Sequence, residues 1–224
     1  MILKGFSEKK DGNMKVSSES GGKFRAEYFS RIGLLPINVV MAGLSDGNKV
    51  AVVTEDNRGQ ILQGYDGLVT NEPEIILGVT AADCLPIYFW NKQNTVIGIA
   101  HAGWRGVKAE IVKEVIKIFT EKYSCNPSDI FAEVGPHIKD CHFEIQDDLV
   151  ETFSADNDCL RNENGHKYLD LSKIIEKQLI SVGLNQNNIN RKSECTFCSE
   201  KYFSYRRDKP NEVEAMVAHV TIKK

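Results

Sequence analysis

A chain of 224 residues with 28 basic and 31 acidic side chains has a formal charge of -3, and this near balance excludes the broad basic surface that binds nucleic acid. No Pro/Gly/Ser-rich linker divides the sequence, so we expect a single domain over residues 1–224 that acts on a small molecule. Residues 1–11 lack the apolar core of a signal peptide, and no run approaches the ~20 apolar residues that span a bilayer. We therefore predict a cytoplasmic protein without a membrane partner, in which the six cysteines are free thiols or ligands.

The amino-terminal part alternates short apolar runs with polar turns. We expect a first strand near Gly5 and a helix over residues 24–32 that ends at Gly33. Four further strand-like runs cover residues 37–41, 50–54, 66–70 and 74–80. The last run leads directly to Asp83 and Cys84, so the strands converge on this thiol.

A predicted hairpin forms the centre of the chain. Residues 85–90 and 95–100 are apolar runs on either side of polar residues 91–94, which is typical of two strands buried on both faces. An antiparallel pairing brings Cys84, before the first strand, and His101, after the second, to the same edge. A thiol and an imidazole at one edge suit a shared metal such as zinc or copper, or a nucleophile and its base.

A helix is predicted after Gly106, and it packs on the sheet until Asn126. Its apolar residues recur at helical spacing: Val112, Val115, Ile116, Phe119 and Tyr123. Arg105 and the unpaired backbone N–H groups at its start are expected to face the same edge as Cys84, which suits an anion such as phosphate. The alternative, that the glycines serve only a tight strand-to-helix turn, stays open.

The remaining elements follow in order to the carboxy terminus. We expect a strand over residues 129–134, a helix over 147–153, a short strand over 167–170, a helix over 171–182 capped by Asp170, an edge strand over 189–192 and a buried strand over 215–222.

Several polar residues lie between these elements. His137 and His142 are near Glu144 after a Pro break, which is one form an active-site loop can take. Arg206 belongs to a pair of arginines that typically faces solvent, although one of them can bind an anionic group of a substrate.

Cys195 and Cys198 form a Cys-x-x-Cys pair. Such a pair can hold half of a zinc site or be redox active, but the sequence contains no second pair. We therefore interpret this pair as structural or incidental and do not assign it a metal.

Five short blocks in order carry a resemblance to a known family: Thr-Ala-Ala-Asp-Cys-Leu-Pro, Ala-His-Ala-Gly-Trp-Arg-Gly, Gly-Pro-His-Ile, Phe-Glu-Ile, and Cys-Thr followed by Tyr-Phe-Ser-Tyr-Arg-Arg-Asp. Over nearly its whole length the chain resembles the YfiH-like family, once called laccase-domain or multicopper polyphenol oxidases. The resemblance implies an α/β class with a layered α/β/α fold around a central mixed sheet. It also implies a zinc-dependent phosphorylase that takes purine nucleosides and phosphate, acts on methylthioadenosine and deaminates adenosine.

The resemblance also implies the metal ligands, which in the family are a His, a Cys and a second His. The last two correspond to Cys84 and His101. The block of the first ligand matches residues 44–50 best, and this match places Asp46 where the family has His. We therefore expect Asp46 as the third ligand, with zinc as the metal and copper as the alternative. A second departure is residues 210–214, where the family usually has a Thr-Gly-Arg-like segment.

Roles for other residues follow from the chemistry that the resemblance implies. Phosphorolysis needs a phosphate beside the anomeric carbon of the ribose, and we expect Arg105 to hold it, with His137 and Arg206 as further substrate contacts. Deamination needs a metal-activated water and a carboxyl group that moves protons, for which Asp83 and Glu144 are the candidates. Cys84 and His101 complete the predicted catalytic set.

Three other functions remain as alternatives. A copper phenol oxidase is disfavoured, because a multicopper site needs many histidines and this chain has five scattered ones. A cysteine hydrolase would use Cys84 as nucleophile and His101 as base. A metal-poor nucleoside-binding or scaffold protein would have lost its activity together with the expected His.

Overall fold

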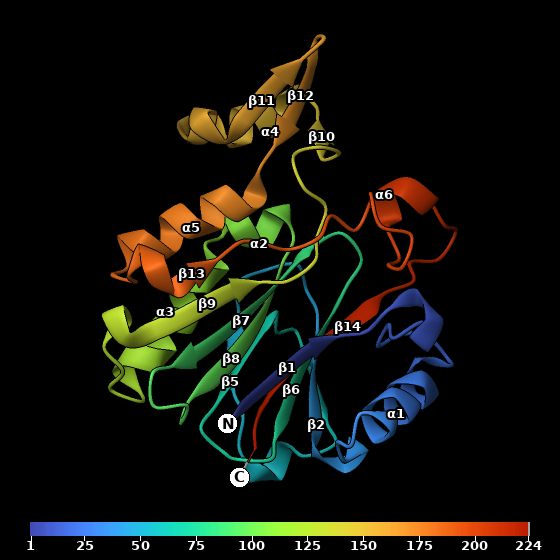
Figure 1. Ribbon diagram of the computed structural model, residues 1–224, viewed down its shortest axis with the longest axis vertical. Coiled ribbons are helices and arrows are strands. Elements are labelled where there is room, and N and C mark those ends of the chain that lie inside the picture. The colour runs from blue at the N-terminus through green and yellow to red at the C-terminus, as the bar shows by residue number, and fades with distance from the viewer. Residues whose placement is uncertain (224) are drawn as a thin grey trace.

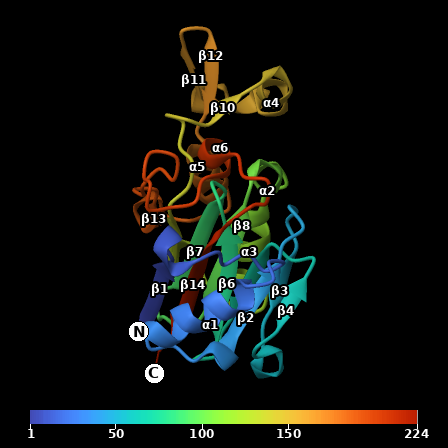
Figure 2. The same ribbon diagram turned by 90° about the vertical axis from the view of Figure 1, so that its right-hand side faces the viewer.

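The strands of this computed structural model, which describes residues 1–223, are divided mainly between two mixed sheets that pack face to face (Figures 1 and 2). The first sheet has the order β1 (Ile2–Phe6), β14 (Met216–Ile222), β6 (Ile76–Ala81), β2 (Val39–Gly43) and β4 (Ile61–Gln63). The second has the order β13 (Ile189–Asn190), β9 (Ile130–Val134), β7 (Leu85–Asn91), β8 (Ile97–Ala102), β5 (Gly67–Thr70) and β3 (Val50–Val52). The predicted layered α/β class is confirmed, and its strands form two stacked layers where we expected one central sheet.

The core between the two sheets follows from the alternation of side chains along each strand. In β8, Ile97 and Ile99 face the first sheet, where they join Leu77 and Val79 of β6 in one buried cluster. Ala100, the residue after Ile99, faces the opposite side and packs against the helical layer. Both faces of β8 are therefore buried, which explains its unbroken apolar sequence.

Helices cover the outer face of each sheet. α1 (Gly21–Arg31) packs on the first sheet through Tyr28 and Phe29, whereas α3 (Ile111–Glu121) and α5 (Leu171–Ser181) pack on the second. Figure 1 shows α3 at the left and α1 at the right, on opposite sides of the stacked sheets. Among residues 1–223, no helix combines the length and the apolar character needed to cross a membrane.

A small subdomain projects beyond one end of the stacked sheets (Figure 1). It contains α4 (Asp147–Thr152) and a three-stranded sheet of β10 (Glu144–Ile145), β12 (His166–Leu169) and β11 (Leu160–Glu163). α6 (Tyr205–Asp208) lies near its base. The described chain also forms short 3-10 turns, at Lys9–Asp11, Pro36–Asn38, Glu55–Asn57, Pro127–Asp129, Ser154–Cys159 and Gln186–Asn188.

The structure confirms the predicted hairpin and corrects two boundaries. β7 and β8 are antiparallel, with Pro86 opposite His101. The single helix expected after Gly106 is wrong, because α2 (Trp104–Lys108) and α3 are separated at Glu110, whose φ of 56° is left-handed. Ile37 lies in a 3-10 turn and not in a strand, because the fixed φ of Pro36 suits the start of a helical turn.

Candidate active site

A cavity of 370 Å³ lies where one end of the first sheet meets one end of the second. Most of its wall is apolar, and we call it the polar cavity because the wall also carries Lys15, Asp46 and His101. Asp46 reaches it from the turn after β2, Cys84 from the connection between β6 and β7, and His101 from β8. The sequence predicted this convergence for Cys84 and His101 from the hairpin alone. The walls also include Lys15 and Tyr205, two residues that the sequence analysis did not select.

The three predicted metal ligands surround a space beside Gly103. A Cβ atom placed on this glycine would lie 3.2 Å from Cys84 Sγ, 3.8 Å from His101 Cε1 and 3.9 Å from Asp46 Oδ1. Thiol, imidazole and carboxylate are all groups that bind zinc. Their side chains therefore form a small cradle with a suitable donor set for one metal ion.

His101 lies beside a buried carboxylate. Only 5 % of its surface is exposed, and its Nδ1 lies 3.5 Å from Asp66 Oδ1 without a hydrogen-bond partner among residues 1–223. Burial alone would lower the pKa of His101, but the neighbouring Cys84 and Asp66 side chains outweigh it and raise this pKa to about 10. A carboxylate behind a metal-binding imidazole is a common second layer of a metal site, where it sets the orientation of the ring.

Asp66 also builds the turn that carries Asp46. Its carboxylate accepts hydrogen bonds from the backbone N–H groups of Ser45, Asp46 and Gly47, at 3.1, 2.9 and 2.9 Å, and from the Ser45 hydroxyl at 2.7 Å. Burial would raise the pKa of Asp66, but these hydrogen bonds and His101 lower it well below its usual range.

Asp46 is both a turn residue and a neighbour of the metal-binding groups. Its φ of 58° is left-handed, which Asp tolerates better than most residues. Oxygen atoms of Asp46 and Asp66 and a ring nitrogen of His101 lie within 4.8 Å of one another. In this one conformation Asp46 serves the turn and also faces the proposed metal position.

A second cavity, of 230 Å³, adjoins the first and is mainly apolar. Trp104, Phe143 and Tyr205 contribute aromatic rings to it. Both cavities have Ala82, Cys84 and Tyr205 in their walls. Tyr205 is 55 % exposed, so its ring lies at the boundary between an aromatic compartment and a polar one.

Asp83 and Arg206 lie in the wall of the apolar cavity and are both engaged in hydrogen bonds. Asp83 Oδ1 accepts from Thr196 Oγ1 at 2.6 Å, and Oδ2 accepts from Ser204 Oγ at 3.0 Å and from the backbone N–H of Arg206 at 2.7 Å. Arg206 Nη1 donates to the Glu144 carbonyl at 2.8 Å. These bonds attach the carboxy-terminal segment to the start of the hairpin.

Three of the predicted residues lie outside the walls of both cavities. Arg105 is exposed and its guanidinium stacks on the Trp104 ring at 4.2 Å. His137 is buried, its Nδ1 lies 2.8 Å from the Gly135 carbonyl, and burial lowers its pKa to about 4. The Glu144 carboxylate lies 2.7 Å from His166 Nδ1, on the projecting subdomain.

Lys15 and Tyr205 had different signals in the sequence. Tyr205 belongs to the aromatic run before the paired arginines. The sequence therefore showed an aromatic residue near a possible substrate contact, but it did not show that this ring lies in the wall of a cavity. Lys15 lies in a polar connection without periodicity, and only the three-dimensional fold brings it to the cavity.

Residues 15–223 match a family model described as multi-copper polyphenol oxidoreductase laccase. The chain belongs to this family. Among curated members of the laccase family, the chain is similar to purine nucleoside phosphorylase YlmD of Bacillus subtilis, with 32 % identity over 182 residues that cover 75 % of this chain and 66 % of YlmD. It is also similar to adenosine deaminase RL5 of an unknown prokaryotic organism, with 32 % identity over 185 residues that cover 76 % of this chain and 70 % of RL5.

A solved structure supports the same assignment. YlmD from Geobacillus stearothermophilus superposes with a TM-score of 0.92 at 26 % identity, over 100 % of this chain and 92 % of that one. The chain spans slightly less than two thirds of the length of the curated YlmD proteins that it matches. Both the YfiH-like family and the fold that the sequence predicted are confirmed.

Proposed function

We propose that the chain is a metal-dependent purine nucleoside phosphorylase, which splits the bond between purine and ribose with inorganic phosphate. The observation that carries this proposal is that a cavity lined by aromatic rings and a cavity whose wall carries Lys15, Asp46 and His101 meet at Cys84. A purine nucleoside has the same division, with a flat aromatic base joined to a polar sugar. The names of the YlmD relatives support the same reaction.

The aromatic cavity is proposed to hold the base. Trp104, Phe143 and Tyr205 offer ring surfaces, and stacking of a base on an aromatic side chain contributes roughly 1–3 kcal/mol. Tyr205 borders both cavities, so it is placed to contact the base where the glycosidic bond begins.

The polar cavity is proposed to hold ribose and phosphate. Lys15 supplies a positive charge in its wall, which favours the phosphate as it approaches the anomeric carbon. Arg105 remains a proposed phosphate ligand, and to act as one its guanidinium must leave the face of Trp104. His137 remains a proposed substrate contact, although its ring nitrogen now faces the Gly135 carbonyl.

We propose zinc as the metal, held by Asp46, Cys84 and His101. A bound zinc ion supplies a Lewis acid and lowers the pKa of a coordinated water, which is the chemistry that deamination of adenosine requires. Asp66 holds the His101 ring from behind. Copper phenol oxidation is less well supported, because His101 is the one histidine of the described chain in the walls of these two cavities.

Deamination of adenosine is a second candidate activity, favoured by the similarity to a relative named adenosine deaminase. Of the two predicted proton-moving carboxylates, Asp83 lies in the wall of the aromatic cavity and Glu144 does not. Asp83 is therefore the stronger candidate for this step.

The test is to incubate zinc-loaded protein with inosine and phosphate and to measure hypoxanthine and ribose 1-phosphate. Base release should require phosphate, and methylthioadenosine should release adenine. Adenosine should yield adenine by phosphorolysis and inosine by deamination, so chromatography separates the two activities. Cys84→Ala should abolish turnover, whereas Cys125→Ser, a thiol away from both cavities, should not.

Two variants of Tyr205 test the proposed stacking of the purine base on its ring. Tyr205→Ala should raise the KM for inosine about tenfold, corresponding to the loss of about 1.4 kcal/mol of stacking, whereas Tyr205→Phe should keep it. If zinc-loaded protein releases no base from any purine nucleoside, the proposal fails. Binding of inosine without turnover would then favour a nucleoside-binding protein. Labelling of Cys84 by iodoacetamide that zinc does not suppress would favour a cysteine hydrolase.

A further inference from the structure

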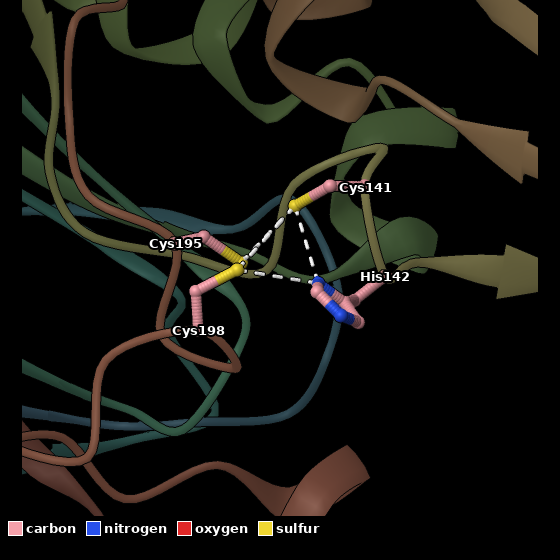
Figure 3. Close-up of side chains that lie close together, drawn as sticks. All are labelled: Cys141, His142, Cys195 and Cys198. Carbon is pink, nitrogen blue, oxygen red and sulfur yellow. Dashed lines mark hydrogen bonds between the residues drawn. The ribbon is translucent and has the colours of Figure 1, made fainter.

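Away from both cavities, two loops bring four metal-binding side chains together (Figure 3). Cys141 and His142 come from the connection between β9 and β10, and Cys195 and Cys198 come from the segment after β13. The three Sγ atoms and a ring nitrogen of His142 lie within 4.8 Å of one another. The Cys-x-x-Cys pair, which looks isolated in the sequence, therefore has two partners that lie more than 50 residues earlier in the chain.

The distances in this cluster resemble the edges of a tetrahedral zinc site. Cys141 Sγ lies 3.6 Å from Cys195 Sγ and 3.8 Å from Cys198 Sγ, and His142 Nδ1 lies 3.3 Å from the sulfurs of Cys141 and Cys198. With Zn–S near 2.3 Å and Zn–N near 2.0 Å, a tetrahedron has S···S edges of about 3.8 Å and S···N edges of about 3.5 Å. These four edges lie within a few tenths of an ångström of the values for zinc, and the two remaining edges, from Cys195 Sγ to Cys198 Sγ and to the His142 ring, are shorter than 4.8 Å.

Backbone N–H groups face one of the sulfurs, and an aromatic ring orients the imidazole. The backbone N–H of Lys139 donates to Cys195 Sγ at 3.5 Å, and the backbone N–H of Cys198 donates to the same sulfur. The His142 ring stacks on Phe197 with the centroids 4.0 Å apart and the planes 15° apart, which holds the ring in place. Such outer contacts are typical of metal ligands.

We infer that Cys141, His142, Cys195 and Cys198 bind one zinc ion in a structural site. Four protein ligands close the coordination shell, which is the usual arrangement of structural zinc, and three thiolates with one imidazole favour zinc over magnesium or calcium. A disulfide is the competing use of these thiols, but it joins two sulfurs at about 2.0 Å and leaves the third thiol and the imidazole without a role.

The ion would fasten the carboxy-terminal segment to the loop after β9. His137 and Cys195 already form a parallel β-bridge, with the Thr196 N–H donating to the His137 carbonyl at 3.0 Å. The hydroxyl of Thr196 in turn binds Asp83 at 2.6 Å. The zinc site would therefore support the wall that carries Tyr205 and Arg206, without itself touching a substrate.

The decisive experiment measures zinc per chain by mass spectrometry of the metal in full-length protein purified under reducing conditions. Cys198→Ser should remove one zinc ion per chain relative to the unsubstituted protein. Cys125→Ser is the matched control, because it also removes one thiol but lies outside the cluster, and it should change nothing. Cys84→Ser should leave this zinc in place, which separates the inference from the proposed catalytic metal.

A second measurement keeps all four proposed ligands in place. Cobalt(II) added to metal-free Cys84→Ser protein should give the visible bands of a tetrahedral site and a sulfur-to-cobalt charge-transfer band with the intensity of three thiolates. His142→Ala should keep that band but weaken cobalt binding. Unchanged zinc content in Cys198→Ser, a cobalt spectrum without thiolate bands, or an intact mass lower by two hydrogens under these conditions would each overturn the inference.

Discussion

At the scale of single residues, Asp46 is the position at which the sequence analysis expects a carboxylate in place of a metal-binding His. Its carboxylate shares the space beside Gly103 with Cys84 and His101, and it occupies a left-handed turn whose backbone binds Asp66. A carboxylate ligand offsets more of the charge of a metal ion than an imidazole does. Water bound to the metal is then less acidic, so zinc should bind with reduced activity.

Substitution of Asp46 tests this interpretation. Asp46→His should raise zinc affinity and nucleoside phosphorolysis, and Asp46→Ala should lower zinc affinity by about tenfold or more, a loss at least as large as that of an outer-shell partner. Zinc affinity is best measured by competition with a chelator in a Cys198→Ser background, so that only one site is loaded. Asp147→Ala, whose side chain is 96 % exposed, is the control. Unchanged affinity in Asp46→Ala would show that Asp46 is not a ligand.

His219 is a second residue with a testable consequence. It is buried against Tyr28 and Phe29, with ring centroids at 5.7 and 5.3 Å, and burial lowers its pKa from 6.5 to about 4. Between these two pH values the unfolded chain binds a proton that the folded chain does not. The free energy of unfolding should therefore fall as the pH drops from about 6.5 to about 4, by up to about 3 kcal/mol from this group.

The measurement is urea unfolding at several pH values between 4 and 7. In His219→Leu the free energy of unfolding should depend less steeply on pH. His137, whose pKa is lowered to about 4 in the same way, should account for a similar share of the pH dependence that remains. Ile180→Ala, which removes no titratable group from a residue that is 42 % exposed, should keep the full slope. Equal slopes in His219→Leu and the unsubstituted protein would contradict burial as the cause.

At the scale of elements, the parts that depend on local pattern were predictable and those that depend on long-range pairing were not. The hairpin of β7 and β8 and the Asp170 cap of α5 follow from neighbouring residues, and both are confirmed. The division into two sheets could not be predicted, because a strand buried on both faces has the same sequence in a single sheet and in a stacked pair. The break at Glu110 was missed because a left-handed Glu has no sequence signature.

The same reasoning explains what the sequence missed in the sites. Cys84 and His101 were predicted because one short hairpin joins them. The partners of Cys195 and Cys198 come from a distant loop, so no spacing rule for paired cysteines detects them.

The connection before β7 gives an element-scale prediction. Asp83 accepts hydrogen bonds from Thr196, Ser204 and the backbone of Arg206, and its side chain is buried. Bonds to a charged acceptor contribute about 1.5–3 kcal/mol each and are not additive, so Asp83→Ala should lower the free energy of unfolding by about 3 kcal/mol. Urea unfolding measures this, with Asp147→Ala as a control near zero. A loss of turnover without a loss of stability would instead assign Asp83 to the chemical step.

At the scale of the whole molecule, the proposed metal site joins the two sheets. Asp46 follows a strand of the first sheet and His101 belongs to the second, and Cys84 lies in the connection from β6 to β7 that passes between the sheets. A ligand that binds only the folded state stabilises it, by about 2.7 kcal/mol at a free concentration of 100 Kd. Zinc should therefore offset damage to the core that lies between the sheets.

Substitution of Ile99 is a suitable way to destabilise this core, because Ile99 is fully buried between the sheets. Ile99→Ala should lower the free energy of unfolding by about 2–5 kcal/mol, whereas Ile180→Ala, on a residue 42 % exposed on α5, should have a much smaller effect. In a Cys198→Ser background, zinc at a free concentration of 100 Kd should raise the free energy of unfolding of Ile99→Ala by about 2.7 kcal/mol. The further substitution Cys84→Ser should abolish this increase. Recovery that persists without Cys84 would place the stabilising ion elsewhere, because only a site that includes this thiol connects the turn of Asp46 to the strand of His101.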